Sequence, residues 1–383
     1  MKTANKLQGI LTTGIGSLPH HNADSALEFS FRSDIPFLPQ IPIRNSWEFM
    51  LPQALEGLPG ISPGAGGAAL LDFTTWSHKA KAFDDKLANA TSSDRYDEFE
   101  PTPHSNSCWK PFLFELGERQ TKFAKIQIAG PFTARWAIQL SEGTPSEALT
   151  QLDRQVFKLI LARSLSMVDR LRSMNVTPLV FIDEPGLYAL APENPRSHAA
   201  LQEVKVLVES LKRRGAQVGL HCCSDPDWKA VFSLGMDVIS FDGERSIKSL
   251  FTHADSALQF MRNGGTFSIG IIPTLLDSSH LSEGGTQEIL DAGILFSRVL
   301  SQVEAAIGSA LRPTHDKVGM ETDGTFLSFL EALKNRLILT PSCGLALHSV
   351  SDAERVQSLL QECRRIAPLA LGLNSLLGST EAH

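Results

Sequence analysis

The sequence predicts an α/β fold, a (βα)8 TIM barrel, and three observations support this prediction. Short apolar runs alternate with amphipathic stretches along the 383 residues, which is typical of strands alternating with helices. Each apolar run ends at a small, polar or reactive residue, as barrel strands do where their loops begin. No Gly-x-Gly-x-x-Gly sequence follows a predicted strand and opens a helix, so the dinucleotide-binding form of the rival fold, an open doubly wound sheet, has little support.

Eight apolar runs are predicted to be strands, because each is short and bounded by polar or turn-forming residues. In chain order they span residues 10–15, 35–38, 125–129, 179–183, 217–222, 238–242, 266–272 and 337–340. Helices are expected between them, at 23–31, 145–174, 198–214, 227–234, 247–262, 287–308 and 353–367. The helix at 145–174 is the clearest, since its apolar residues recur every three or four positions while charged residues fill the other face. It is expected to pack on the sheet.

The chain is expected to form one domain, residues 1–383, with an insertion after the second strand. The segment 57–118 departs from the strand and helix pattern: Gly- and Pro-rich turns at 57–67 are followed by a polar stretch at 79–100. Loops of this length usually carry structure of their own or cover a site. We therefore expect 57–118 to form an insertion over the barrel mouth.

Composition and charge exclude several classes of function. Hydrophobic residues make up 42% of the chain and charged residues 20%, as in an ordinary compact protein. Lys and Arg total 35 against 42 Asp and Glu, without a basic cluster, so nucleic acid is not an expected partner. No apolar run reaches the length of about 20 residues that crosses a membrane, and no signal-like segment follows Lys2 and Lys6, so a cytoplasmic protein is expected.

Cysteine usage indicates metal or catalytic chemistry rather than disulfides. The chain has five cysteines, an odd number, and shows no export signal. Because side chains alternate along a strand, His221 and Cys223 at the end of the strand 217–222 point to the same face, and Cys222 points to the opposite one. A His-x-Cys pair at a strand end offers two ligands to a metal ion.

Further ligands are predicted at two other strand ends. Cys343 follows the last predicted strand, and Asp242 ends the strand after that of His221, with Glu244 as the alternative. Taken singly, each of these residues is more often a packed core residue than a ligand. Together they predict a zinc site at one rim of the sheet, because zinc takes four ligands of these types.

This set of ligands favours thiol alkylation over hydrolysis. Two thiolates and a neutral imidazole cancel the charge of Zn²⁺, so a substrate bound as a thiolate makes the site net negative and stays nucleophilic. Zinc lowers the pKa of a thiol from its free value of about 8.5, so that thiolate exists at neutral pH. A hydrolytic zinc site would more typically contain histidines and a carboxylate.

Several motifs in addition to the ligands match one family. They are Thr12-Thr13-Gly14-Ile15-Gly16-Ser17, Arg44-Asn45, Gly130-Pro131-Phe132-Thr133 with Trp136, Ile182-Asp183-Glu184-Pro185, and Pro341-Ser342-Cys343-Gly344-Leu345. With these motifs the chain resembles the C-terminal catalytic barrel of cobalamin-independent methionine synthase. That barrel belongs to a superfamily that includes uroporphyrinogen decarboxylase and the methylcobalamin:coenzyme M methyltransferases.

The resemblance implies a role for individual residues. His221, Cys223, Asp242 and Cys343 would hold Zn²⁺, although the family normally has Glu where Asp242 stands. Ile15, Gly16 and Ser17 would bind the carboxylate of the amino acid substrate. Asp183 would bind its amine and is the residue expected to be catalytic, with Glu184 beside it as a further substrate-binding residue. Trp136 would lie against the methyl donor. The alternatives are an ordinary βα turn for 15–17, helix capping for Asp183 and Glu184, and core packing for Trp136.

The chain also departs from the family pattern. Ile41 stands where the family has a Glu that helps to hold the homocysteine amine, and Pro273-Thr274-Leu275 stands where it has an Asp-x-His linked to protonation. His20 and His280 are candidates to replace that histidine. The family enzyme also has an N-terminal barrel that helps to bind the folate, for which 383 residues leave no room. The methyl donor therefore stays open between methyl-folate and a methyl-corrinoid protein.

The function expected from the sequence is that of a zinc-dependent thiol S-methyltransferase of the homocysteine-to-methionine type. Its partners would be a small thiol such as homocysteine and the methyl donor, with no nucleic acid and no membrane. One alternative is an enzyme similar to uroporphyrinogen decarboxylase, which needs no metal and has an arginine-lined pocket. Another is a non-catalytic zinc-binding barrel that partners a corrinoid protein.

Overall fold

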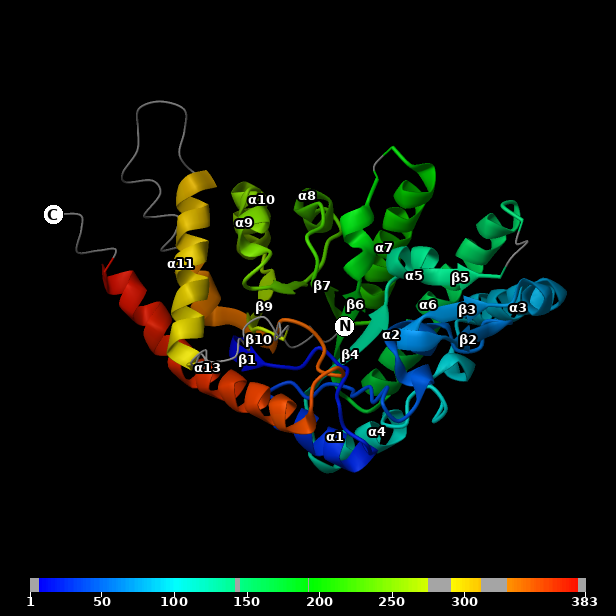
Figure 1. Ribbon diagram of the computed structural model, residues 1–383, viewed down its shortest axis with the longest axis horizontal. Helices are drawn as coiled ribbons and strands as arrows, with labels where there is room; N and C mark the ends of the chain where they lie inside the picture. Colours follow the sequence, from blue (N-terminus) through cyan, green and yellow to red (C-terminus); the bar gives the residue numbers. More distant parts are fainter. Residues whose placement is uncertain (1–6, 142–144, 192, 275–290, 311–328, 378–383) are drawn as a thin grey trace, which may run out of the picture.

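The structure, a computed structural model, describes residues 7–141, 145–191, 193–274, 291–310 and 329–377. Its centre is a curled sheet of seven parallel strands in the order β1-β10-β9-β8-β7-β6-β4, and Figure 1 shows helices surrounding these strands. The strands are β1 (Gly9–Thr12), β4 (Phe123–Ala129), β6 (Thr177–Asp183), β7 (Gln217–Cys222), β8 (Val238–Asp242), β9 (Thr266–Ile272) and β10 (Arg336–Pro341). Seven of the eight predicted strands are therefore confirmed, in an α/β fold with a parallel sheet.

The remaining predicted strand, 35–38, is not a strand in the structure. It is an extended segment that hydrogen-bonds to both edges of the sheet: the Ile35 amide donates to the Thr12 carbonyl of β1, and the Leu38 amide donates to the Lys125 carbonyl of β4. Pro36 and Pro39 explain the difference, because proline has no N–H to contribute to a ladder. The segment nevertheless occupies the gap between the two edge strands.

The helices cover the outer face of the sheet, where the side chains of Val218, Leu220 and Cys222 join the main hydrophobic core, as expected. The predicted helix 145–174 is confirmed as α6, and 247–262 is divided into α9 and α10 around His253. The helices are α1 (Ala23–Ser30), α2 (Met50–Leu55), α3 (Phe73–Ser93), α4 (Trp109–Glu118), α5 (Pro131–Ala137), α6 (Ala148–Ser173), α7 (Pro195–Arg213), α8 (Trp228–Phe232), α9 (Ile247–Phe251), α10 (Ala254–Arg262), α11 (Ala292–Ala310) and α13 (Val350–Leu377). Of those described, none is both long and apolar enough to span a membrane.

The inner face of the sheet is apolar in one part and polar in the other. A second, smaller core cluster includes Leu179 and Phe181 of β6, Val238 of β8 and Ile338 of β10. The same face also presents charged and polar side chains, all buried. Lys125 and Gln127 of β4 lie level with Leu179 and Phe181, whereas Asp183 and His221 lie at the carboxyl ends of β6 and β7, with Ser240 of β8 paired to His221. In barrel enzymes chemistry is found at this end of the strands.

The segment 57–118 contains both helices and strands. It forms β2 (Ile61–Pro63), β3 (Ala69–Leu71), α3 and α4, and β3 lies between β2 and β5 (Ile138–Leu140) in a separate three-stranded sheet. Figure 1 shows β2, β3 and α3 close to α6. Trp76 of α3 donates to the side chain of Gln155 of α6 at 2.8 Å. That the insertion covers the mouth stays a prediction.

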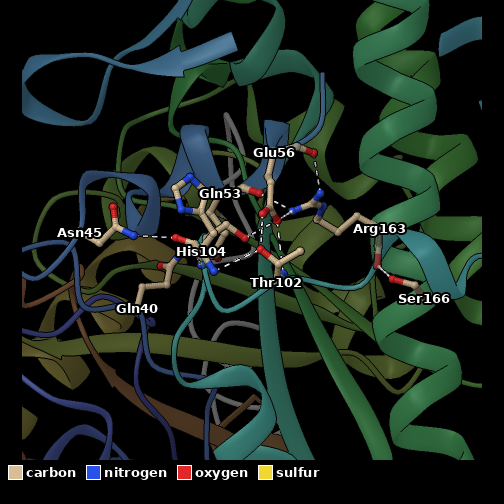
Figure 2. Close-up of polar contacts among 9 residues, drawn as sticks. Gln40, Asn45, Gln53, Glu56, Thr102, His104, Arg163 and Ser166 are labelled. Carbon is tan, nitrogen blue, oxygen red and sulfur yellow. Dashed lines mark hydrogen bonds and ion pairs between the residues drawn. The ribbon is translucent and has the colours of Figure 1, made fainter. Parts of the chain in front are cut away.

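A buried polar network ties the segment around residues 53–56 and 102–105 to α6, and Figure 2 shows its members. Arg163 of α6 donates to the Glu56 carboxylate at 3.1 Å, to the Glu56 carbonyl at 2.6 Å and to the Gln53 carbonyl at 2.7 Å. Glu56 also accepts hydrogen bonds from the hydroxyls of Thr102 and Ser105. Since the side chain of Arg163 is only 4% exposed and that of Glu56 11%, each charge depends on the other.

We expect Arg163→Met to lower the free energy of unfolding by about 3 to 5 kcal/mol, because it leaves the Glu56 carboxylate buried without its cation. Arg170→Met on the same helix is the matched control, since the Arg170 side chain is 47% exposed in its ion pair with Glu100. In Arg170→Met the free energy of unfolding should fall by about 1 kcal/mol or less. Urea unfolding measures both, and equal losses would contradict the assignment.

Candidate metal centre

Three side chains with metal-binding atoms meet at the carboxyl end of the sheet. His221 lies near the end of β7, Cys223 follows β7, and Cys343 follows β10. Their ligand atoms all lie within 4.8 Å of one another. Because β8 and β9 separate β7 from β10 in the sheet, only the curl of the sheet can bring these residues together. The predicted convergence of His221, Cys223 and Cys343 is thus present in the structure.

Strand alternation explains how the side chains are presented. His221 is buried on the inner face, and Gly219, two residues earlier, leaves room for the ring of Phe181: a Cβ on Gly219 would lie 2.8 Å from that ring. Cys222 points to the helix side, where its sulfur lies 3.1 Å from the Ser224 hydroxyl. At β10 the register with β9 shifts between Thr340 and Pro341, just before the loop that carries Cys343. Such irregularities redirect the chain at a strand end.

The two sulfur atoms of the site shift each other's pKa in opposite directions. A hydrogen bond from the Cys223 thiol lowers the pKa of Cys343 to about 4, helped by a hydrogen bond and the charge of His221 and opposed by burial. The same hydrogen bond, together with burial, raises the pKa of Cys223. A divalent cation would neutralise the charge of two thiolates, so the donor set of two sulfurs and one imidazole fits zinc.

Ser240 orients the imidazole and was missed by the sequence analysis. It is the residue of β8 paired with His221, and its hydroxyl lies 3.1 Å from Nδ1 of His221 in a buried hydrogen bond. With Nδ1 engaged in this way, Nε2 is the ring nitrogen that would bind a metal ion. The signal was present in the sequence, because alternation along β8 places Ser240 and Asp242 on the same face.

The two candidates for a fourth ligand have other contacts. Asp242 accepts hydrogen bonds from the amides of Glu244 and Arg245 at 2.8 and 3.1 Å, which closes the turn after β8. Glu244 forms an ion pair with Arg298 at 3.6 Å. Within the described part of the chain, neither carboxylate belongs to the group of ligand atoms around His221. A fourth ligand from this turn stays a prediction.

The turn Ile15-Gly16-Ser17 presents free N–H groups beside the sulfur site. Its carbonyls are all engaged: Ile15 accepts from Nζ of Lys125 at 2.6 Å, Gly16 from the amide of Gln40 at 3.0 Å, and Ser17 from the amide of Leu345 at 2.8 Å. Among the described residues, no acceptor is found for the amides of the three turn residues themselves. Consecutive free amides of this kind bind anions.

Glycines allow this turn to approach its neighbours. Gly16 has a φ of 151°, and a Cβ there would lie 2.5 Å from the side chain of Gln127. A Cβ on Gly344 would lie 2.0 Å from the Ser17 hydroxyl. The turn is therefore in direct contact with the loop that carries Cys343, and any anion bound by the turn would lie near the sulfur atoms.

The two predicted carboxylates differ in their environment. Asp183 ends β6 beside His221 in the register, and within the described residues its buried Oδ1 has no hydrogen-bond partner. Burial raises the pKa of Asp183 to about 6, against the opposing charges of His221 and Lys125. Glu184 instead accepts hydrogen bonds from the amides of Phe132 and Thr133, at 2.9 and 2.6 Å. Glu184 therefore caps α5, whereas Asp183 has an oxygen available.

Trp136 is 41% exposed, so it is not a core residue. Its ring stacks on Phe132 with centroids 4.8 Å apart, and the guanidinium of Arg196 lies 4.8 Å from the ring centroid. A flat ligand would have to bind beside these two groups or displace one of them. The contact with a methyl donor stays a prediction.

Ile41 and His20, two residues that the sequence analysis singled out, are both buried. Ile41 is fully buried in the main core. His20 is also buried, packs edge-on against Phe29 at 5.2 Å, and has a pKa lowered by burial. His280 lies outside the described residues. Among the described residues, the buried Nδ1 of His20 has no hydrogen-bond partner. A role for His20 in protonation stays a prediction.

A large cavity of about 990 Å³ lies away from this site. Residues that line it include Gln217, Thr266 and Arg336, which begin β7, β9 and β10. It therefore opens at the amino ends of the strands, opposite to His221 and Cys343. Because barrel enzymes carry their chemistry at the carboxyl ends, we do not assign the candidate site by cavity size.

Comparison with known proteins gives a distant structural similarity. Models of protein families give no match, and curated proteins give none either. Among solved structures, the chain is similar to a B12-independent methionine synthase from Shewanella sp. W3-18-1, determined in complex with selenomethionine. The two sequences are 16% identical, the match covers 68% of this chain and 67% of that chain, and the TM-score is 0.42. The proposals below therefore depend on this chain's own residues.

We expect Ser240→Ala to weaken zinc binding by about 10- to 100-fold, because it removes the group that orients His221. Ser268→Ala is the matched control: Ser268 is the neighbour of Ser240 on β9, and its hydroxyl has no hydrogen-bond partner among the described residues. Competition with a chromophoric chelator measures both affinities. Equal affinities of the two variants would show that Ser240 does not orient the ligand.

We expect Glu184→Gln to flatten the pH dependence of stability. Burial raises the pKa of Glu184 from 4.5 to about 7 in the folded protein. The folded state then binds more protons than the unfolded state between these values, so this carboxyl lowers the free energy of unfolding as pH rises through them. In Glu184→Gln that decrease should shrink by at most about 3 kcal/mol, which urea unfolding from pH 4.5 to 7.5 measures. An unchanged pH profile would contradict the assignment.

Proposed function

We propose that this protein is a zinc-dependent methyltransferase that transfers a methyl group to a thiol, with homocysteine as the type of acceptor. The observation that carries the proposal is the group of two sulfurs and one imidazole within 4.8 Å at the carboxyl end of the sheet. A zinc ion bound there would lower the pKa of an acceptor thiol, so that the nucleophilic thiolate exists at neutral pH.

His221, Cys223 and Cys343 would hold the metal. Zinc takes four ligands, and catalytic zinc sites keep one position for water or substrate. The three residues supply three ligands, and the sulfur of the acceptor is the fourth in our proposal. Asp242 could occupy that position without an acceptor through its Oδ2, because the amides of the turn after β8 both donate to its Oδ1.

Two features beside the metal group suit an amino acid. The free amides of Ile15, Gly16 and Ser17 would bind its carboxylate, and the unpartnered oxygen of Asp183 would bind its ammonium group. Both lie next to metal-binding residues: Ser17 contacts the Cys343 loop, and Asp183 pairs with His221 in the sheet. An α-amino acid whose side chain ends in a thiol matches this arrangement.

In the proposed reaction, a bond forms between the acceptor sulfur and the methyl carbon. The bond between that carbon and the donor breaks, with its electron pair remaining on the donor, and the thiol proton leaves the site. The donor is a methyl-folate or a methyl-corrinoid protein. Exposed Trp136 would contact it, since this ring lies on α5, directly after β4.

The alternatives predict other results. A decarboxylase similar to uroporphyrinogen decarboxylase would not need the metal, and nothing in its chemistry requires two cysteines beside a histidine. A non-catalytic barrel that partners a corrinoid protein would bind zinc but would not act on thiols. Zinc content and methyl transfer therefore separate the three functions.

We expect Cys223→Ser to lose bound zinc and to reduce methionine formation from homocysteine at least 100-fold, because it removes one ligand. Metal analysis of the purified protein measures the first effect. Assays with methyl-folate and methylcobalamin in parallel measure the second and identify the donor.

Cys222→Ser is the matched control, because Cys222 is the adjacent residue and its sulfur lies on the helix side of β7. It should keep both zinc and activity. A wild-type protein that holds zinc but methylates no thiol with either donor would contradict the proposed function in favour of the non-catalytic barrel. A protein without zinc would contradict both.

A further inference from the structure

Lys125 is a fully buried lysine on the inner face of the sheet, and none of the roles above uses it. It lies on β4 at 0% exposure, where its Nζ donates to the Ile15 carbonyl at 2.6 Å and to Gln127 Oε1 at 3.1 Å. The same Nζ lies 4.7 Å from the centroid of the Phe181 ring. Burying an ammonium group is costly, and a Met or Leu would fill the space. Packing alone therefore does not account for a lysine here.

We infer that Lys125 is a positioning residue for the substrate-binding turn Ile15-Gly16-Ser17, an inference that rests on the proposed function. A trans peptide group holds its C=O and N–H in opposite directions. Since Lys125 holds the Ile15 carbonyl, the Gly16 amide in the same peptide group points away from Lys125. The hydrogen bond from the Gln40 amide to the Gly16 carbonyl fixes the Ser17 amide in the same manner.

A charged donor suits this role better than a neutral one. Hydrogen bonds from an ammonium group are stronger than those between neutral groups, and they polarise the peptide group that accepts them. The Gly16 amide becomes a better donor as a result. The positive charge of Lys125 also favours an anion at the turn.

Asp183 offers a second explanation that has to be separated from the first. Its carboxylate and the Lys125 ammonium attract each other, so Lys125 could serve only to balance that charge. In that case the loss of Lys125 would weaken the binding of the substrate's amine by Asp183 and would leave the binding of its carboxylate unchanged. Two ligands that differ only in the carboxylate distinguish the explanations.

The test is binding to the zinc-loaded protein, measured by isothermal titration calorimetry with L-homocysteine and with 3-aminopropane-1-thiol, which lacks the carboxylate. In Lys125→Met we expect the dissociation constant of homocysteine to rise at least 10-fold and that of the aminothiol to change less than 3-fold, with zinc content unchanged. Lys122→Met, an exposed lysine immediately before β4, is the matched control and should change neither constant.

Each other outcome has a definite meaning. Equal weakening of both ligands in Lys125→Met would overturn the positioning role in favour of charge balance with Asp183, and no weakening would overturn it as well. If the wild type binds both ligands equally, the turn does not bind the carboxylate, and the inference fails while the proposed function stands. If the wild type binds neither ligand, the proposed function fails and the inference with it.

Lys125→Arg keeps the experiment decisive if Lys125→Met does not fold. The guanidinium keeps the charge beside Asp183, but its larger planar group cannot reproduce the short contact with the Ile15 carbonyl. We expect a selective loss of homocysteine affinity in this variant too, at least 5-fold relative to the aminothiol. An unchanged ratio of the two affinities would overturn the inference.

Discussion

The curl of the parallel sheet is the constraint on which the candidate site depends. His221 and Cys223 come from β7 and Cys343 comes from the loop after β10, and two strands lie between them. In a flat sheet these residues would be about three strand spacings apart, roughly 14 Å, and could not share an ion or a proton. The same curl leaves a gap between β1 and β4, which the extended segment around Ile35 and Leu38 fills with hydrogen bonds to both edges.

Three buried charged residues lie on or directly after the neighbouring strands β4 and β6. Lys125, Asp183 and Glu184 have almost no exposure, although each would be better solvated in water. Glu184 is compensated by the amides of α5 and Lys125 by the Ile15 carbonyl, whereas Asp183 keeps an unsatisfied oxygen. Burying such groups lowers the stability of the fold, and the apolar cluster around Phe181 and Val238 offsets part of that loss.

The parts of the fold that could be predicted from the sequence are those with strong local signals. The strands at 217–222, 238–242 and 266–272 have the predicted bounds, because they are apolar runs buried on both faces. The prediction of a strand at 35–38 was wrong, because Pro36 and Pro39 have no N–H to contribute to a ladder. His221, Cys223 and Cys343 stand out by residue type. Alternation along β8 places Ser240 on the inner face, but its partner His221 and the partner of Lys125, Ile15, lie on other elements, so the contacts themselves could not be predicted from local patterns. The contacts of Asp242 likewise depend on the turn that follows it.

The hydrogen bond from the Leu345 amide to the Ser17 carbonyl joins parts of the chain that are far apart in sequence. During synthesis on the ribosome, the turn at Ser17 and the pair at His221 and Cys223 emerge long before Cys343. The nascent protein therefore carries His221 and Cys223 without Cys343 while the residues between Cys223 and Cys343 are added. The group of His221, Cys223 and Cys343 can form only after β10 has joined the sheet.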